Sequence, residues 1–337
     1  MAERVDVAVV GGGVTGLAAA WALARAGREP LVLEQFRVGN THGSSHGATR
    51  IFRLAYEEPE WVLLAQEALG LWRELERESG TALLDLNGLV DLPVDAAALT
   101  ATLDACDTAY ELLGPAEVER RFGLVTDCCK AVFQPEAGVV RADRALQAFG
   151  AGVHVREAAR VRALVPHGDG VRLETDDGSI EAEVAVVAAG AWAKPLLART
   201  GIDLPVVPTR ETVAYFRLAR DRAVPSVIDY GNRETYALTA GPGLVKVGVH
   251  HSGPPTDPDE PGVPDEAIVR FAAAWAAGAF SLASPEPVSV ETCLYTSTAD
   301  TRFVLERHGP VVVCSACSGH GFKFAPAVGR HVAALLS

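Results

Sequence analysis

The sequence predicts a mixed α/β fold (α+β overall), with a Rossmann-type nucleotide-binding part and a second, mainly antiparallel β-sheet part. Three observations support this prediction: a glycine-rich turn that follows an apolar strand pattern near the start of the chain, a second apolar strand pattern that ends in an acidic residue, and many short β-patterned segments after residue 204. The chain has 337 residues, of which 49% are hydrophobic and 22% charged. This length and composition are sufficient for two domains with buried cores.

The beginning of the chain has the pattern of a dinucleotide-binding βαβ unit. The apolar run 5–10 precedes the glycine-rich segment Gly11–Gly16, which is followed by a helical pattern rich in alanine and leucine. In such a unit the first glycine permits the tight turn, Gly13 lets the backbone approach a pyrophosphate, and Gly16 lets helix and strand pack closely. The helix N-terminus offers free N–H donors to the phosphates, and Glu34, at the end of the next apolar run, can accept hydrogen bonds from the ribose. An ordinary glycine-rich βα turn is the alternative interpretation.

Charge and cysteine content exclude several classes of function. The formal net charge of −13 argues against nucleic acid or an anionic membrane surface as a partner. Asp6 and three consecutive glycines interrupt the only apolar stretch near the start, so we expect neither a signal peptide nor a membrane span. The six cysteines are unevenly spaced, which favours reduced thiols in a cytoplasmic protein. Cys314 and Cys317 have the spacing of half a zinc site, but no second pair accompanies them, so we expect no metal.

The first half of the chain alternates helical and strand patterns. Residues 60–78 show helical spacing of apolar side chains, and residues 83–92, with an Asn-Gly pair at their centre, predict a hairpin. Residues 95–149 are mostly helical in pattern. Residues 171–189 predict another hairpin, whose second strand ends in small residues at Gly190, where the backbone can approach a ligand. The chain therefore returns to the nucleotide-binding part at this point.

The second half supplies the other sheet. Residues 205–250 and 286–299 contain short β-patterned runs separated by proline and glycine, which predicts a largely antiparallel sheet. A proline-rich loop over 252–264 precedes a helix over 265–277, and a short strand and a terminal helix end the chain. We expect two discontinuous domains: a nucleotide-binding domain of residues 1–82, 151–203 and 298–337, and a second domain of residues 83–150 and 204–297.

Three segments combine glycine with basic residues: 43–53, 246–250 and 318–324. Each could be a solvated surface, because Lys and Arg are mostly exposed. Lys246, however, stands among apolar residues with a strand pattern, where its ammonium would be desolvated unless it met an anion or water. A protein of net charge −13 needs such a local basic site to hold an anionic small molecule.

Nearly the whole chain resembles the monomeric sarcosine oxidase and N-methyltryptophan oxidase group of the D-amino-acid-oxidase-like FAD oxidoreductases. The resemblance rests on five segments in the same order: residues 11–16, 47–53, 246–250, 291–296 and 319–324. It implies a monomeric flavoprotein that holds FAD covalently through Cys293. It also implies oxidation of a secondary amino acid, N-methyl or cyclic, to an imine, with reduction of O2 to H2O2.

The resemblance also implies roles for single residues. Arg53 and Lys323 resemble a pair that binds the substrate carboxylate, which suits a bidentate guanidinium and a point-charge ammonium. Lys246 resembles a lysine that promotes the reaction with O2, where a fixed positive charge stabilises developing superoxide-like charge. The residues expected to be catalytic are Lys246, Arg50, His250 and Tyr295. Those expected to contact substrate are Arg53, Lys323, Tyr236, Gly319 and His320. Those expected to contact the cofactor, including the glycine-rich turn and Glu34, are Gly11, Gly13, Val14, Thr15, Gly16, Glu34, His46, Thr49, Arg50, Gly190, Cys293, Gly319, Gly321, Phe322 and Lys323.

Departures from the pattern of this group leave the substrate open. The only methionine is Met1, Cys317 replaces a phenylalanine just before Ser318, and the helix that begins near Asp143 is short. One alternative function is a flavin dehydrogenase that uses another electron acceptor, against which Lys246 argues. A second alternative is a catalytically silent flavin-binding protein.

Overall fold

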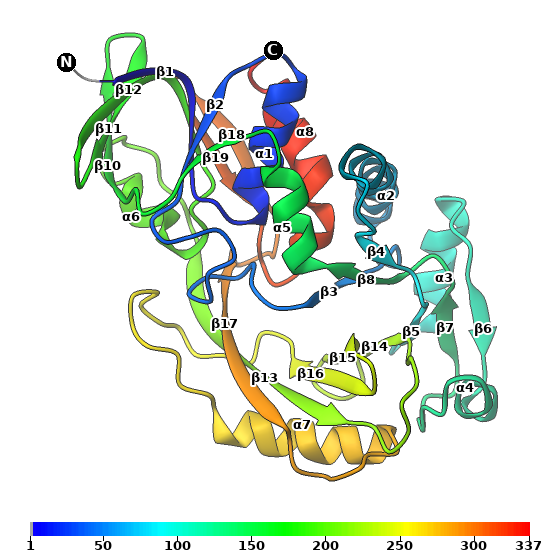
Figure 1. Ribbon diagram of the computed structural model, residues 1–337. Helices are drawn as coiled ribbons and strands as arrows, with labels where there is room; N and C mark the ends of the chain where they lie inside the picture. The colour runs from blue at the N-terminus through cyan, green and yellow to red at the C-terminus, as the bar shows by residue number, and fades with distance from the viewer. Residues whose placement is uncertain (1–2) are drawn as a thin grey trace.

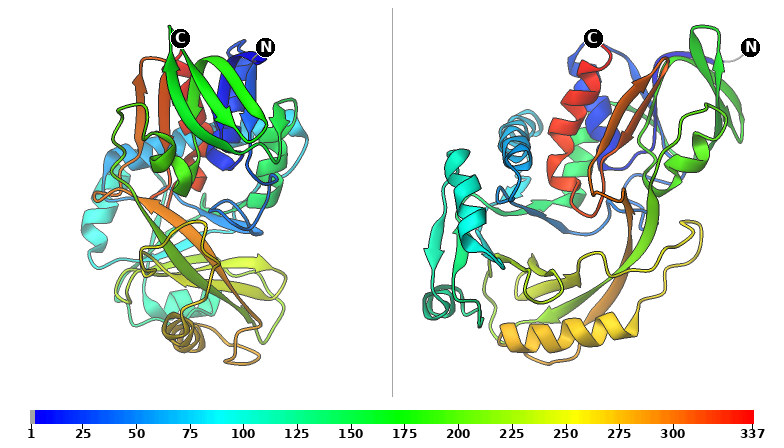
Figure 2. Two further views of the ribbon diagram at one scale, coloured as in Figure 1. Left: turned by 90° about the vertical axis from the view of Figure 1, so that its left-hand side faces the viewer. Right: turned by 180° about the vertical axis from the view of Figure 1, so that it is seen from behind.

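The computed structural model describes residues 3–337 and contains two eight-stranded sheets and one three-stranded sheet. Figure 1 shows the first large sheet at the top, the second at the bottom, and the small sheet of β3 (Thr49–Phe52), β8 (Gly138–Arg141) and β4 (Leu84–Asp85) between them. The two views in Figure 2 show the same separation of the large sheets. The predicted mixed α/β fold with a second, mostly antiparallel sheet is confirmed.

The first large sheet has a parallel centre. β1 (Glu3–Val10) pairs in parallel with β2 (Pro30–Leu33) and with β12 (Gly178–Val187), and β2 pairs in parallel with β9 (His154–Arg156). The first half of β12 pairs with β11 (Gly170–Thr175), which forms the predicted hairpin, and β10 (Val161–His167) lies outside it. The second half of β12 pairs in parallel with β19 (Val311–Ser315), whose other neighbour is β18 (Val304–His308). The chain thus returns to this sheet twice.

Three helices lie together over one face of this sheet: α1 (Val14–Arg25), α5 (Ala142–Gly150) and α8 (Ala325–Ala334) (Figure 1). Small residues let α1 and α8 approach closely, since a Cβ on Gly329 would lie 2.3 Å from the carbonyl oxygen of Ala18. The longest helix, α2 (Pro59–Ser79), begins with proline and ends before Gly80 in the left-handed conformation, as helix-end preferences favour. It packs against α8 through its apolar side.

The second large sheet has the order β17-β13-β16-β15-β14-β5-β7-β6. Its strands are β17 (Ser289–Ser297), β13 (Val207–Arg217), β16 (Leu244–Val249), β15 (Thr235–Gly241), β14 (Ser226–Asp229), β5 (Leu89–Leu92), β7 (Ala131–Gln134) and β6 (Glu111–Leu113). One face packs on α7 (Glu266–Ala279), which lies along the far side of the sheet in Figure 1. Asp265 caps α7 by accepting from the N–H groups of residues 267 and 268. The opposite face points toward the first sheet.

The hairpin predicted over residues 83–92 is wrong. β4 pairs with β8 in the small sheet, whereas β5 pairs with β14 and β7 in the second large sheet. The Asn-Gly pair between them carries the chain from one sheet to the other: Asn87 donates to the carbonyl of Val224 at 2.7 Å, and Gly88 has φ +90°. The mostly helical pattern predicted for 95–149 is also only partly correct. α3 (Ala96–Ala105), α4 (Pro115–Phe122) and α5 form, but strands β6, β7 and β8 lie between them.

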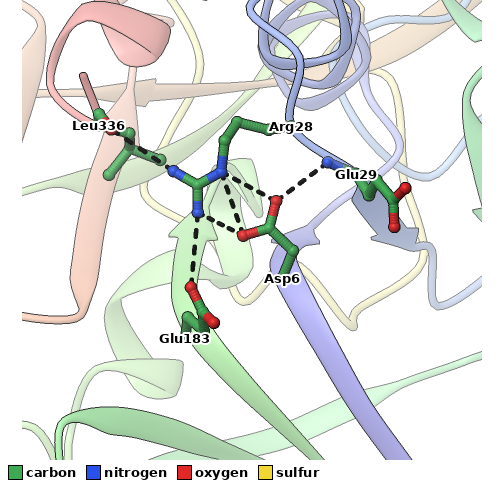
Figure 3. A network of polar contacts seen from close by, with 5 residues as sticks. All are labelled: Asp6, Arg28, Glu29, Glu183 and Leu336. Carbon is green, nitrogen blue, oxygen red and sulfur yellow. Dashed lines mark hydrogen bonds and ion pairs between the residues drawn. The ribbon is translucent and has the colours of Figure 1, made fainter.

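An ion pair between Asp6 and Arg28 lies at the end of the βαβ unit opposite the glycine-rich turn, beside the connection from α1 to β2 (Figure 3). Asp6 on β1 accepts from Nε of Arg28 at 2.9 Å and from the backbone N–H of Glu29 at 3.0 Å. Arg28 also reaches the carbonyl of Leu336 at 3.4 Å and the carboxylate of Glu183 at 3.9 Å. The hydrogen bonds from Arg28 keep the pKa of Asp6 below its usual value. The network therefore connects four chain segments around the edge opposite the glycine-rich turn: Asp6, residues 28–29, Glu183 and Leu336.

Across residues 3–337, no helix combines the length and the apolar character that crossing a membrane would require.

Candidate active site

One elongated cavity connects the glycine-rich turn with the inner face of the second large sheet. The segments that form its wall come from both large sheets and from the loops between them. The predicted site residues in this wall are Gly11, Gly13, Val14, Thr15, Glu34, Arg50, Arg53, Gly190, Tyr236, Lys246, His250, Cys293, Tyr295, Gly319, His320, Gly321, Phe322 and Lys323. The structure thus gathers residues from nearly the whole length of the chain around a common space.

At the end of the cavity formed by the glycine-rich turn, there is no space for a side chain at positions 11 and 16. Gly11 has φ +110°, and a Cβ there would lie 2.5 Å from the carbonyl oxygen of Ala188. A Cβ on Gly16, in the first turn of α1, would lie 1.9 Å from the carbonyl oxygen of Gly11, so only glycine at this position lets the helix pack this closely on the turn. Gly13 at the N-cap leaves the first turn of α1 facing the cavity, which is the arrangement that a pyrophosphate needs. These residues fit a dinucleotide.

Glu34 follows β2 and lies beside this turn. Its carboxylate accepts from the N–H of Gly12 at 2.7 Å and from the N–H of Phe36 at 2.8 Å. Burial raises the pKa of Glu34, against the opposing effect of these two hydrogen bonds. Each carboxylate oxygen keeps a second lone pair, so the group can both hold the turn and accept from a ribose hydroxyl. The sequence did not indicate that Glu34 also accepts a hydrogen bond from Gly12 and so stabilises the turn.

Strand register places the predicted site residues of β15, β16 and β17 on one face of the second large sheet. Cys293 pairs with Glu211, Tyr215 pairs with Lys246, and Tyr236 pairs with Gly248, so these side chains share a face. A Cβ on Gly248 would lie 2.5 Å from the hydroxyl oxygen of Tyr236, so that glycine is what lets the ring lie across β16. The opposite face carries the apolar residues that bury α7.

Lys246 is buried on this inner face, with 7% of its surface exposed. Its Nζ lies 6.0 Å from the ring centre of Tyr215, and Leu238 is its other strand neighbour. Burial lowers the pKa of Lys246 to about 7, and the nearby guanidinium of Arg50 acts in the same direction. The sequence prediction of a desolvated lysine in a strand is confirmed.

Arg53 and Lys323 converge on the ring of Tyr56 at the other end of the cavity. The guanidinium of Arg53 lies 4.0 Å from the ring centre, and the ammonium of Lys323 lies 5.8 Å from it. Lys323 is 5% exposed, donates to the carbonyl of His320 at 2.7 Å, and has its pKa lowered by burial. Its own carbonyl accepts from the indole of Trp72 on α2 at 2.7 Å. Two buried cations side by side form a site suited to an anion.

His250 and Tyr295 stand between the two ends, and a tight glycine turn holds them. Nδ1 of His250 lies 3.3 Å from the hydroxyl oxygen of Tyr295. Gly319 has φ +73°, and a Cβ there would lie 2.5 Å from the His250 ring and 2.4 Å from the Tyr295 ring. Burial lowers the pKa of His250 well below its usual value, so the imidazole is neutral at pH 7. His320 is also neutral, because burial lowers its pKa to about 3.

Several predicted residues lie behind the wall of the cavity. Arg50 reaches the wall, but its guanidinium donates to the carbonyls of Ser44, His46 and Thr49, so it holds the 43–49 loop. His46 and Thr49 are buried and do not form part of the wall, and Thr49 donates to the carbonyl of Thr239 at 2.8 Å. Contacts of all the predicted site residues with cofactor or substrate stay predictions. Within residues 3–337, no cluster of three or more His, Cys, Asp or Glu side chains is arranged to hold a metal ion.

The sequence analysis missed four residues around Arg53: Tyr56, Asp91, Gln134 and Tyr230. Tyr230 accepts a hydrogen bond from the guanidinium, and Asp91 lies 3.7 Å from it. Tyr56 lies only three residues after Arg53, so the basic and aromatic pattern was a usable signal. Asp91 and Gln134 lie on strands distant in the sequence, and Tyr230 lies in the turn directly after β14, so no local pattern marks them.

The model of the family of FAD-dependent oxidoreductases known as DAO matches residues 6–335. The chain belongs to this family. It is 33% identical to the monomeric sarcosine oxidase of Bacillus sp. (strain B-0618), over 98% of this chain and 91% of that protein. It is 32% identical to the peroxisomal sarcosine oxidase of Homo sapiens, over 96% and 90% of the two chains. Among solved structures, NikD, described as an unusual amino acid oxidase essential for nikkomycin biosynthesis, superposes with a TM-score of 0.88 and 30% identity over 99% of this chain and 94% of NikD.

These relatives make the protein an FAD-dependent amino-acid or amine oxidase of the sarcosine oxidase group, which acts on CH–NH donors. The geometry agrees with membership of the DAO family: a glycine-rich dinucleotide turn at one end of the cavity and a buried basic site at the other. The FAD that the family implies is therefore matched by the residues present.

Substitution of Gly319 by alanine should disrupt the site without unfolding the protein. The new Cβ collides with His250 and Tyr295, so we expect turnover to fall by about a hundredfold through their displacement. Gly309→Ala is the matched control, because Gly309 also has a left-handed φ of +59° but has nothing within 4 Å of its Cβ position. Steady-state kinetics beside urea unfolding test this expectation. Equal losses of turnover in the two variants would show that backbone strain alone is responsible.

Proposed function

We propose that the protein oxidises the C–N bond of a secondary amino acid, N-methyl or cyclic, to an imine, and reduces O2 to H2O2. The observation that carries this proposal is the pair of buried cations, Arg53 and Lys323, at the end of the cavity opposite the glycine-rich turn. An amino acid bound there by its carboxylate has its amine directed along the cavity, toward the sheet face that carries Lys246 and Cys293. The sequence similarity of this chain to sarcosine oxidases, at 32–33% identity, supports a secondary amino acid as the substrate.

The residues of the site divide the work of binding and charge control. Arg53 offers parallel N–H donors and Lys323 a point charge, so together they orient a carboxylate. Tyr236 and Tyr295 provide aromatic walls around the amine, while neutral His250 adds no charge that would repel it. When bound, FAD supplies the two-electron oxidation and passes the electrons to O2. Lys246, when protonated, places a positive charge at the sheet face for the anionic oxygen species that develops.

We also propose that Cys293 forms a covalent link to the flavin. The thiol lies in the wall of the cavity, on the face that carries Lys246. Burial raises the pKa of Cys293, while Arg50 and Lys246 act in the opposite direction and favour its thiolate. A thiolate is the nucleophile that such a bond requires. Formation of the S–C bond would release one proton from the thiol and one from a methyl group of the flavin ring, and O2 would take up the two electrons.

Anaerobic mixing with a panel of amines tests the proposed reaction. Sarcosine, other N-methyl amino acids, proline and pipecolate are added to the yellow protein, and the visible flavin absorbance is followed. We expect at least one of them to bleach the flavin, and we expect H2O2 once air is readmitted. The rate of bleaching should rise with pH, because the amine must react as its neutral base. Absence of bleaching with every member of the panel would contradict the proposal.

Substitution of Cys293 by serine should leave FAD bound but extractable. After acid precipitation we expect the colour in the supernatant for this variant and in the pellet for the unmodified protein. Cys317→Ser is the matched control, since its thiol also lies in the cavity wall. If the control releases its flavin and Cys293→Ser keeps it, Cys317 carries the bond instead.

Substitution of Lys246 by methionine should slow flavin reoxidation by about a hundredfold while reduction by substrate changes little. Methionine keeps most of the side-chain volume and removes the charge. Stopped-flow absorbance measures the two half-reactions separately. Lys130→Met, at an exposed lysine outside the cavity, is the control and should change neither rate. Equal slowing of both half-reactions in Lys246→Met would contradict a specific role toward O2.

A further inference from the structure

A buried carboxylate lies directly behind the guanidinium of Arg53. Asp91 on β5 is fully buried, and its Oδ1 lies 3.7 Å from Nη1 of Arg53 with no hydrogen bond of its own. Asp91 is not part of the cavity wall, whereas Arg53 is. The carboxylate therefore acts on ligands through Arg53 rather than by contact.

Gln134 on β7 fixes the orientation of this carboxylate. Its Oε1 accepts from the backbone N–H groups of Leu54 at 3.0 Å and Ala55 at 2.7 Å, so its amide nitrogen must face the other way. That nitrogen donates to Oδ2 of Asp91 at 2.5 Å. The contacts form a closed ring, in which the two residues that follow Arg53 hold Gln134, Gln134 holds Asp91, and Asp91 faces the side chain of Arg53. Asp91 and Gln134 are both completely buried, so the ring is sheltered from water.

The ring changes the charge balance of the anion site. Arg53 and Lys323 alone would present two positive charges in a buried space, and Asp91 cancels one of them. Buried charges are stable only when they are paired, so the remaining positive charge matches one carboxylate. A second carboxylate on the ligand would be left without a partner.

We propose that Asp91 and Gln134 are positioning residues that hold Arg53 and restrict the site to amino acids with a single carboxylate. This inference rests on the proposed function, since it takes Arg53 and Lys323 as the carboxylate site. It adds a selection rule that the cavity wall alone does not contain: dicarboxylic N-alkyl amino acids are rejected by charge rather than by size.

Protonation of Asp91 should weaken this selection. Burial raises the pKa of Asp91 to about 7, despite the opposing effects of Arg53 and Gln134. Below this pH the carboxyl group is neutral and the site gains net positive charge. Among the other titratable groups around Arg53, burial lowers the pKa of His250 and of His320, so both are neutral near pH 7, and it raises the pKa of Tyr230 to about 12. Lys323 and Arg53 lower the pKa of Tyr56 against the effect of its burial, and burial lowers that of Lys323.

Two thioether acids test the rule by binding rather than by turnover. (Methylthio)acetate carries one carboxylate and thiodiglycolate carries two, and the sulfur that replaces the amine prevents oxidation. Their Kd values are measured on the flavin-loaded protein from the change in visible absorbance. For Asp91→Asn, which keeps the shape and the hydrogen bond from Gln134, we expect the preference for the monocarboxylate to fall by about tenfold or more. As the pH falls through 7, we expect the dicarboxylate to gain more affinity than the monocarboxylate in the unmodified protein, and we expect Asp91→Asn to lose this difference. Lys246, whose pKa is also about 7, contributes equally to both proteins, so the comparison isolates Asp91.

Gln134→Met separates position from charge. It frees Asp91 and Arg53 to move but keeps the negative charge, so both probes should bind more weakly by the same factor. An unchanged Kd for both probes in this variant would overturn the positioning role. An Asp91→Asn preference within about twofold of the unmodified protein would overturn the charge rule. Arg53→Gln tests the carboxylate site separately. If both probes bind the unmodified protein but not Arg53→Gln, Arg53 is part of the carboxylate site, whatever Asp91→Asn shows. If neither probe binds the unmodified protein, the carboxylate site itself is wrong, and this inference fails with it.

Discussion

The two-residue alternation of the second large sheet is the constraint on which the site depends. Odd and even positions of each strand point to opposite faces, so one register decides both what packs on α7 and what faces the cavity. Tyr215 pairs with Lys246, and Lys246 in turn pairs with Leu238. A slip of one residue in β16 would move Lys246 into the apolar layer beneath the sheet and put Val245 or Val247 in the cavity. The hydrophobic face toward α7 therefore protects the chemistry of the other face, because burial of that face permits only one register.

Charge is the second constraint, and the molecule manages it locally. The chain carries a net charge of −13, yet the cavity contains three buried or nearly buried cations, Arg53, Lys246 and Lys323. Each is surrounded differently: Arg53 has a carboxylate and two phenol rings, Lys323 has a carbonyl and the face of Tyr56, and Lys246 has mainly apolar and aromatic neighbours. These surroundings make Arg53 a permanently held charge and Lys246 a charge that titrates near neutrality. One site therefore contains one cation that is fixed in charge and one whose charge can be exchanged.

The sequence predicted those parts of the fold that local patterns encode. The glycine-rich turn, the hairpin of β11 and β12, the helix α7 and the unusual Lys246 follow from spacing within a few residues. The candidate role of Cys293 came from family resemblance alone, since a single cysteine in a strand carries no signal. Asp91, Gln134 and Tyr230 could not be predicted, because β5 reaches Arg53 only through its parallel pairing with β14 and its antiparallel pairing with β7. The Asn-Gly pair at 87–88 was misread for the same reason: strand partners are chosen by tertiary packing, and the local turn only permits them.

Trp72 gives the arrangement a consequence beyond the cavity. Its indole lies in the core under α2 and donates to the carbonyl of Lys323, whose ammonium points the other way into the anion site. The position of the Lys323 ammonium therefore depends on α2, a helix with no residue in the cavity wall. Small changes in how α2 packs on α8 would therefore move Lys323 and shift its ammonium in the anion site. Because Trp72 lies outside the cavity wall, a substitution in the core under α2 can shift Lys323 without altering any residue that lines the cavity.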